Sequence, residues 1–180
     1  MHPVETERLL LRPVENRDLP SFVSLNANPL VMRYFPRTLT AQESGAFFEK
    51  VKELARDKGL GLMAVELKNT KSIAGFVGLG TPRFEAHFTP CTEIMWRFHQ
   101  EFWGHGYATE AAKAVLEQGF ISCGLDEIVS FTAVHNKASI AVMKKIGMQP
   151  HPEPTFSHPR LPDGHPLKRH VLYCAHKPAG

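Results

Sequence analysis

Two glycines one residue apart stand directly before a run of strong helix formers, in the stretch HQEFWGHGYATEAAKAVLEQGF at residues 99–120. A helix N-terminus carries unpaired backbone N–H groups and a partial positive charge, and it therefore attracts phosphate. Glycine before that terminus lets the backbone approach an anion without an intervening side chain. Gly104 and Gly106 therefore predict a phosphate-binding loop, and the alternative is a tight turn that binds nothing.

Two common phosphate motifs are excluded by the residues around these glycines. The sequence has no G-x-x-x-x-G-K-[ST] stretch, so a P-loop for mononucleotides is absent. The dinucleotide motif G-x-G-x-x-G would need a third glycine where Thr109 stands. The loop therefore belongs neither to a mononucleotide P-loop protein nor to a Rossmann dehydrogenase.

The elements that position the loop follow from the periodicity around it. A strand at 92–99 leads into the glycines, and a helix at 106–120 leads out of them. A second strand at 127–135 and a helix at 136–147, ended by Gly147, come next. Because a helix of this length makes the usual crossover, the two strands are expected to be parallel neighbours.

The first half of the chain predicts a strand at 8–14, a helix at 16–28 begun by Asn16 or Asp18, a helix at 40–59, and a hairpin of two strands at 60–68 and 72–80. The second helix has a capping box, because Glu43 follows Thr40 by three residues, and a stop at Gly59. The expected class is thus α/β, with helices around a mixed sheet.

The C-terminal part differs in composition. Seven of the 14 prolines and five of the 10 histidines lie at 150–178, which predicts an irregular loop at 150–168 and a last strand at 169–176. The histidine spacing is unlike that of zinc sites, so no metal is expected. His158, Arg160 and His165 either shape the entrance for a substrate or are solvated loop residues.

Composition limits the kind of protein. A chain of 180 residues, 43% hydrophobic and 22% charged, is predicted to form a single domain at 1–180, with a core at about 6–176. The net charge of +3 is not concentrated in a basic block, and no nucleic-acid motif is present. The three cysteines form no C-x-x-C pair, and no apolar run reaches 18 residues. A cytoplasmic protein without a membrane span is expected.

Four motifs, in order, resemble the GNAT superfamily of acetyl-coenzyme A-dependent N-acyltransferases, in its RimJ/RimL-like branch for ribosomal-protein N-termini. They are ETERLLLRPVENRDLPSF near the start, AGFVGL in the hairpin, EFWGHGYATEA at the glycine loop, and NKASIAVMKKIGM in the last helix. The resemblance spans about residues 6–176 and implies a mostly antiparallel twisted sheet with one splayed parallel pair. It also implies acetyl-coenzyme A (acetyl-CoA) as the acyl donor.

The resemblance implies a cofactor site for the pyrophosphate and the pantetheine arm. The residues implied are Trp96, Arg97 and Phe98 through their backbones, the loop and first helical turn from Gly104 through His105, Gly106, Tyr107 and Ala108 to Thr109, and Asn136. Glu101 departs from the family's loop, which carries Gln or Arg there. For Asn136 and Ser139 the alternative is a helix N-cap followed by an ordinary helical residue.

Acyl transfer to an amine needs a base, because most amines are protonated at neutral pH. Glu93 resembles the family's acidic residue on this strand, and its alternative is a solvent-facing glutamate. The tyrosine that often protonates the leaving thiolate is replaced by Met143. Ser139, or more distantly Tyr173, is the remaining candidate donor.

The expected reaction is acetyl transfer to a primary amine, either a protein N-terminus or a small molecule such as an antibiotic. A protein that binds coenzyme A without turnover is the alternative from another class, and Glu101 and Met143 favour it. The expected state is a monomer or a homodimer.

Overall fold

The computed structural model describes residues 2–58 and 60–178, and within them the chain forms one eight-stranded sheet in the order β1-β2-β3-β4-β5-β6-β8-β7. The strands are β1 Val4–Glu5, β2 Leu9–Pro13, β3 Leu62–Leu67, β4 Ile73–Gly80, β5 Glu93–Phe98, β6 Glu127–Ala133, β7 Gln149–Ser157 and β8 Arg169–His176. The helices are α1 Leu19–Ala27, α2 Ala41–Lys58, α3 Tyr107–Ile121 and α4 Lys137–Lys145, with 3₁₀ turns η1 Asn16–Asp18 and η2 Gln100–Phe102. The expected α/β class is confirmed.

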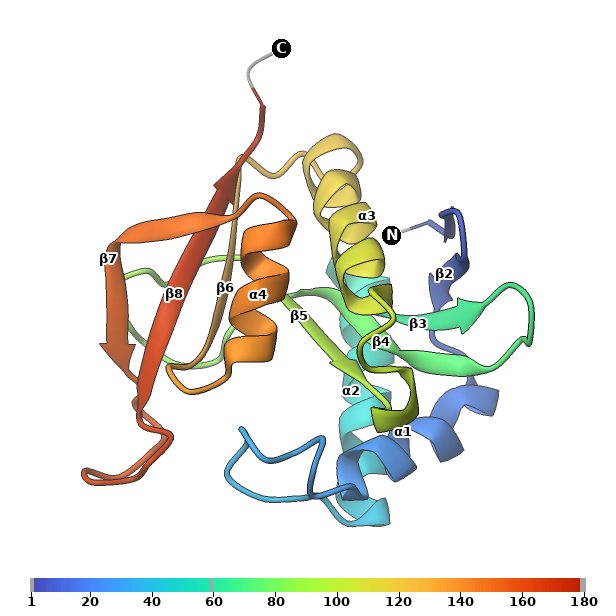
Figure 1. Ribbon diagram of the computed structural model, residues 1–180, viewed down its shortest axis with the longest axis horizontal. Coiled ribbons are helices and arrows are strands. Elements are labelled where there is room, and N and C mark those ends of the chain that lie inside the picture. The colour runs from blue at the N-terminus through green and yellow to red at the C-terminus, as the bar shows by residue number, and fades with distance from the viewer. Residues whose placement is uncertain (1, 59, 179–180) are drawn as a thin grey trace.

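One pair of strands, β5 and β6, runs parallel, as the crossover helix α3 requires. Within the described chain these strands share a single register pair, Glu93 with Val129, and then diverge (Figure 1). Each stays fully paired on its other side, β5 with β4 and β6 with β8. The result is a fork in the middle of the sheet, which confirms the predicted splayed pair.

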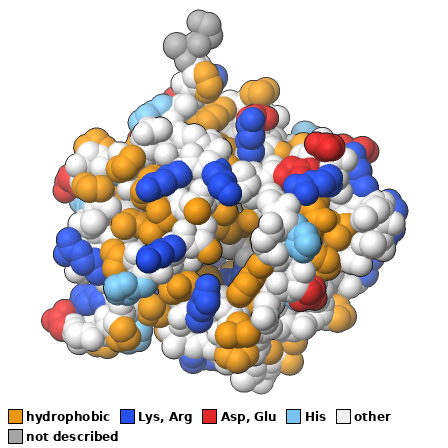
Figure 2. Space-filling model, viewed as in Figure 1, with side chains coloured by type: hydrophobic (Ala, Val, Ile, Leu, Met, Phe, Trp, Pro, Cys, Tyr) orange, Lys and Arg blue, Asp and Glu red, His pale blue; other side chains and the backbone are white. Residues whose placement is uncertain are grey.

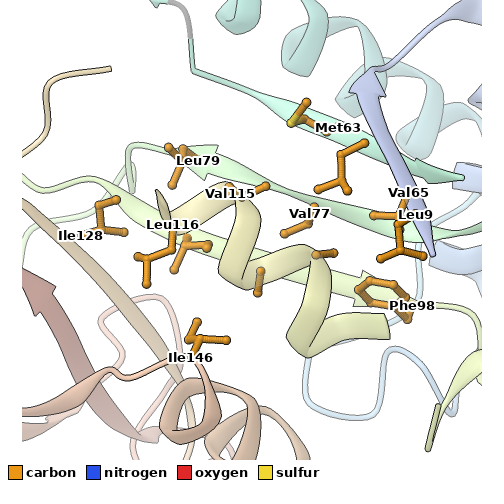
Figure 3. Packing of buried hydrophobic residues seen from close by; sticks show 14 of the residues in the cluster. Leu9, Met63, Val65, Val77, Leu79, Phe98, Val115, Leu116, Ile128 and Ile146 are labelled. Carbon is orange, nitrogen blue, oxygen red and sulfur yellow. The ribbon is translucent and has the colours of Figure 1, made fainter. Parts of the chain in front are cut away.

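The two faces of the sheet carry different helices (Figure 1). On one face, α3 packs its small and branched residues onto the strands, among them Val115 and Leu116 against Val77 and Leu79 (Figure 3). On the other face, Phe22 of α1 and Phe48 of α2 form a second cluster with Phe76. Helix α3 thus covers one side of the sheet, and α1 and α2 cover the other. Their packing holds the fork between β5 and β6 in place.

The N-terminal helix begins at the later of the two positions that the sequence suggests. Asp18 stands at the N-cap of α1 but makes no capping bond, because its buried carboxylate accepts from Arg12 at 2.8 Å and from the backbone of Glu15. Residues 16–18 therefore form the separate turn η1. For α2 the capping box is confirmed, since Glu43 N–H donates to Thr40 Oγ1 at 3.2 Å; the predicted stop at Gly59 lies outside the described residues.

The predicted irregular loop at 150–168 is partly wrong, because β7 occupies Gln149–Ser157 and pairs with β8. Its register shifts between Pro150 and Thr155, across the prolines. Proline lacks an N–H donor and is tolerated on an edge strand, and β7 is the last strand of the sheet. The predicted last strand at 169–176 is confirmed with the same bounds.

Among the residues that the structure describes, none of the helices combines the length and the apolar character that crossing a bilayer requires.

Candidate active site

The glycine loop lies between η2 and α3, at the wide end of the fork. Gly104 and Gly106 both have φ of 81°, and Gly106 is the left-handed N-cap of α3. The first intrahelical bond runs from Glu110 N–H to Gly106 O at 3.0 Å. The N–H groups of Tyr107, Ala108 and Thr109 precede that bond and have no partner within the helix. The loop therefore has the geometry of an anion site.

An arginine near the N-terminus braces this loop. Arg8 Nη1 donates to His105 O at 2.9 Å, and Arg8 Nε donates to Glu110 Oε2 at 2.7 Å. The guanidinium also lies 4.6 Å from the ring centre of Tyr107. Arg8 thus ties the loop to the first turn of α3, but its charge is paired with that of Glu110, 2.7 Å away. The exposed Glu101 adds no positive charge either. Sequence reasoning missed Arg8, although it lies in the quoted ETERLLLRPV motif.

The backbone of β5 offers free hydrogen-bonding groups to the fork at alternate residues. His99 N–H donates to Ala74 O at 3.0 Å, so residues 97 and 99 face β4 in the antiparallel ladder. The intervening residues face the other way, and Ile94 O accepts from Ser130 of β6 at 3.0 Å. The N–H and C=O groups of Trp96 and the N–H group of Phe98 therefore face the open fork, whereas Phe98 O accepts from Trp103 Nε1 at 3.0 Å. The backbone groups of Arg97, expected to do the same, are directed to Phe76 of β4.

Glu93 stands at the point where β5 and β6 separate. Its side chain lies on the sheet face opposite α3, because its pairing partner across β4 is Gly80 and the alternate residues Leu79 and Ile94 belong to the α3 cluster. Burial raises the pKa of this carboxyl to about 8. A carboxylate with a pKa near the working pH suits a general base. This is the role that the resemblance implies for Glu93.

Asn136 and Ser139 open α4 on the other side of the fork. Asn136 Oδ1 accepts from Ser139 N–H at 3.3 Å, so the N-cap interpretation of Asn136 holds. Asn136 Nδ2 donates to Thr132 Oγ1 at 2.8 Å and to Ser139 Oγ at 3.0 Å. Since the Ser139 oxygen accepts this bond, its own O–H is free to donate elsewhere.

The other candidate donor, Tyr173, and the position of the family's usual tyrosine are both buried. Tyr173 of β8 pairs with Ser130, and its ring lies in the main core cluster, where it is 8% exposed. Met143, which stands in place of the usual tyrosine, is 1% exposed in the same cluster. The position that departs from the family pattern is thus filled by an apolar core residue.

We expect Met143→Tyr to destabilise the protein without a gain in turnover. The larger ring overpacks the core, at a cost of ~1–3 kcal/mol, which corresponds to a loss of roughly 2–10 °C in Tm for a chain of this size. Thermal melts measure the loss, and the volume-conserving Met143→Leu is the control. An unchanged Tm together with a higher kcat would show instead that a phenol at this position reaches the departing sulfur.

Aromatic and histidine rings form a wall on the β6–β8 half of the Glu93 face. Phe131 of β6 lies on this face by strand alternation from Val129, and it contacts a cluster that contains Phe84, Phe88, Phe156, His158 and His170. Burial first, and then the charges of His170 and Arg160, lower the pKa of His158 to about 4. His158 is therefore neutral at neutral pH. The predicted role of His158, Arg160 and His165 at the substrate entrance stays a prediction.

One set of possible metal ligands lies outside this site in the described part of the chain. Side-chain atoms of Glu127, Cys174 and His176 lie within 4.8 Å of one another. Glu127 and His176 are direct partners on β6 and β8, and Cys174, two residues before His176, lies on the same strand face. Strand pairing by itself therefore brings the three together.

The comparisons with known proteins agree with this geometry. A family model described as "Acetyltransferase (GNAT) domain" matches residues 8–149, and the chain belongs to this family. An uncharacterized N-acetyltransferase of Bacillus subtilis, YnaD, is 34% identical over 151 residues, which is 83% of each chain. The chain is therefore an N-acetyltransferase that uses acetyl-CoA as its acyl donor.

Solved structures share the whole fold. A GNAT-family acetyltransferase from Bacillus anthracis has a TM-score of 0.80 at 28% identity, with 97% of this chain and 98% of that chain covered. RimL, a ribosomal L7/L12 α-N-protein acetyltransferase in complex with coenzyme A, has a TM-score of 0.79 over 97% and 98% of the two chains. Its identity is 14%, so this likeness concerns the fold alone. The predicted likeness to RimJ/RimL-type enzymes is confirmed at that level.

Proposed function

We propose that the acceptor is a primary amine, such as the α-amine of a peptide or protein N-terminus, and that Glu93 deprotonates it. The observation that carries this proposal is the place of Glu93, a half-buried carboxyl at the apex of the fork. The glycine loop lies on the α3 side of the sheet, whereas the Glu93 side chain lies on the opposite face. The acyl group of the donor would pass through the fork from the α3 side of the sheet. On the opposite face it would meet an amine held beside Glu93.

The donor site fits the residues that line the α3 side of the fork. Backbone N–H groups from Gly104 to Thr109 would hold the pyrophosphate at the helix terminus. The backbone groups of Trp96 and the N–H group of Phe98 would pair with the amide groups of the pantetheine arm, and Asn136 would face the arm from α4. Figure 2 shows a hollow between α4 and β5 with Lys and Arg side chains around it. The exposed lysines of α4 are Lys137, Lys144 and Lys145, and their charge suits an anionic donor.

Glu93 takes a proton from the ammonium group, directly or through water, and the free amine attacks the thioester carbonyl. The C–N bond forms while the oxyanion accepts a hydrogen bond from a backbone N–H near Phe98. The nitrogen of the intermediate then loses its second proton to water and the C–S bond breaks. The thiolate takes a proton from water, with Ser139 O–H donating a hydrogen bond to the sulfur. A thiol pKa of about 8.5 makes the thiolate a tolerable leaving group.

An assay of thiol release against a panel of amines tests the proposal. We expect thiol to appear only when both acetyl-CoA and an amine are present, with the acetylated amine detected by mass spectrometry. A non-catalytic coenzyme A-binding protein would instead show a higher Tm with acetyl-CoA and no amine-dependent thiol. A small-molecule acceptor would be favoured if free amines react and peptide N-termini do not.

Ser139→Ala tests the donor role of this serine. We expect kcat to fall by ~10-fold, the effect of one lost hydrogen bond to a charged group, with little change in the affinity for coenzyme A. Steady-state kinetics and calorimetry measure the two quantities, and Ser139→Thr, which keeps the hydroxyl, is the control. Full activity of the alanine variant would mean that the thiolate leaves without a side-chain donor.

The remaining features of the proposal rest on sequence. We propose a cytoplasmic enzyme, supported by Cys91, Cys123 and Cys174, which are free thiols. A single domain at 1–180, without nucleic-acid binding or a resident metal, and a monomeric or homodimeric state remain predictions.

A further inference from the structure

Arg97 shares a strand face with the proposed base. In β5, Glu93, Met95 and Arg97 alternate with the residues that pack against α3, so all three side chains lie on the opposite face. Their partners across β4 are Gly80, Gly78 and Phe76. Two of these partners have no side chain, so β4 itself adds little bulk beside Glu93 and Met95. The face on which we place the acceptor therefore carries a base at one end and a cation at the other.

The guanidinium of Arg97 is only partly satisfied. Its Nη1 donates to Oδ1 of the buried Asn26, and the group stacks over the ring of Phe35 at 4.2 Å. Its Nε is sealed from solvent and has no hydrogen-bond partner. Among the side chains that the structure describes, no carboxylate forms an ion pair with it, whereas the buried Arg12 has both Asp18 and Glu66. Burial lowers the pKa of Arg97 to about 10.

Only one end of this guanidinium is open to a ligand. Nη1 is occupied by Asn26 and Nε is enclosed by the protein, which leaves Nη2 as the group that a ligand can reach. A carboxylate accepts a charge-assisted hydrogen bond from such a group. A half-buried cation without a counter-ion is costly, and an anion at Nη2 reduces that cost. The lid formed by Asn26 and Phe35 holds the guanidinium in place but does not neutralise it.

The distance between the two groups limits the size of the ligand. Four residues of a strand span about 13 Å, at about 3.3 Å per residue. An extended peptide advances about 3.5 Å per residue. An amine beside Glu93 and an anion beside Arg97 are therefore separated by roughly two to four residues of peptide.

We propose that Arg97 binds a carboxylate of the acceptor, so that the preferred acceptors are short peptides or N-terminal segments with a carboxylate within about two to four residues of the reactive amine. The carboxylate comes either from the C-terminus of a short peptide or from an Asp or Glu side chain near the N-terminus. This inference rests on the proposed function, because it places the amine at Glu93.

Matched acceptor pairs test the inference. Each pair is a tripeptide with a free C-terminus and its C-terminal amide, and a second pair, amidated at the C-terminus, carries Asp or Asn at the third residue. For wild type we expect kcat/KM at least ~10-fold higher for the charged member of one pair, the effect of one charge-assisted hydrogen bond or more. The pair that shows the preference identifies the source of the carboxylate. Equal values within both pairs would overturn the inference.

Variants assign the preference to this side chain. We expect Arg97→Met to bring the charged-to-neutral ratio close to one, mainly by raising KM for the charged acceptor, and Arg97→Lys to keep part of the ratio. Arg33→Met is the control, because Arg33 is exposed and stacks over Tyr34 and Trp103. Thermal melts and acetyl-CoA affinity check the fold of each variant. A ratio that survives in a folded Arg97→Met variant would overturn the inference.

Binding measurements separate this inference from the proposed function. Calorimetry with N-acetylated tripeptides, as acid and as amide, needs no turnover. Tighter binding of the acid, lost in Arg97→Met or reduced in Arg97→Lys, supports the anion site even if no amine releases thiol. Equal binding of acid and amide by wild type argues against the site whether or not the enzyme turns over.

Discussion

Glu93→Gln is expected to lower kcat/KM by ~10²-fold or more, because the amide cannot accept the proton that the amine must lose. The change preserves size and shape, so the fork between β5 and β6 and the affinity for coenzyme A should be retained. Steady-state kinetics with a reactive amine measure the loss, and thermal melts verify the fold.

The pH dependence of kcat/KM tests the role of Glu93 more specifically. Burial raises the pKa of Glu93 to about 8, so the base is mostly protonated below pH 8 and ionised above it. The wild-type kcat/KM should therefore rise with pH through this value and then level off, in addition to any ionisation of the amine itself. In Glu93→Gln the rise assigned to the enzyme should disappear, and only the ionisation of the amine should remain.

A second glutamate in the sheet provides the matched control. Glu127 begins β6, is exposed and faces His176 at 3.6 Å, away from the fork. Glu127→Gln should leave both the rate and the pH profile close to those of wild type. If Glu93→Gln retains near-normal activity and the same acidic limb, another group or bulk water takes the proton, and the role assigned to Glu93 is wrong.

The sequence predicts those parts of the site that depend on local patterns. The Gly104 and Gly106 turn, the strand before it and the helix after it are adjacent in the chain, so periodicity and the glycine spacing suffice to place them. The fork follows from one further rule, that a crossover helix joins parallel neighbours. Asn136 at the start of α4 is likewise a local capping signal.

Contacts between distant segments could not be predicted in the same way. Arg8 reaches Glu110 across 102 residues, and Arg97 meets Asn26 across 71 residues. Neither pair produces a periodic pattern in the sequence, because a single charged residue in a predicted strand is normally interpreted as facing solvent. The strand β7 was missed because its prolines indicate a loop, and only the vacant edge of β8 explains why they are tolerated there. The orientation of Arg97 can be predicted only once the register of the β4–β5 pair is known. That register directs its backbone groups toward β4 and its side chain toward the face that carries Glu93.

Gly106→Val is expected to weaken coenzyme A binding by roughly 10²-fold, the equivalent of about two lost charge-assisted hydrogen bonds. At φ of 81° a β-branched residue is strained, and the loop would shift to relieve it. The new side chain would also extend from a Cβ 3.4 Å from Arg8 Nη2, and so disturb the contact that braces the loop. The N–H groups at the start of α3 would then lose their common orientation toward the phosphates. Calorimetry with coenzyme A measures the effect.

Backbone strain alone must be separated from loss of the anion site, and Gly124 allows this. It also has positive φ, 66°, and open space around its Cβ position, but it follows the far end of α3. Gly124→Val should therefore cost a similar ~1–3 kcal/mol in stability while coenzyme A binds as it does to wild type. If both variants bind coenzyme A normally, the glycine pair serves only the turn between η2 and α3, and the pyrophosphate is held elsewhere. If both lose binding equally, general destabilisation explains the result. Loss in Gly106→Val alone assigns the anion to the N-terminus of α3.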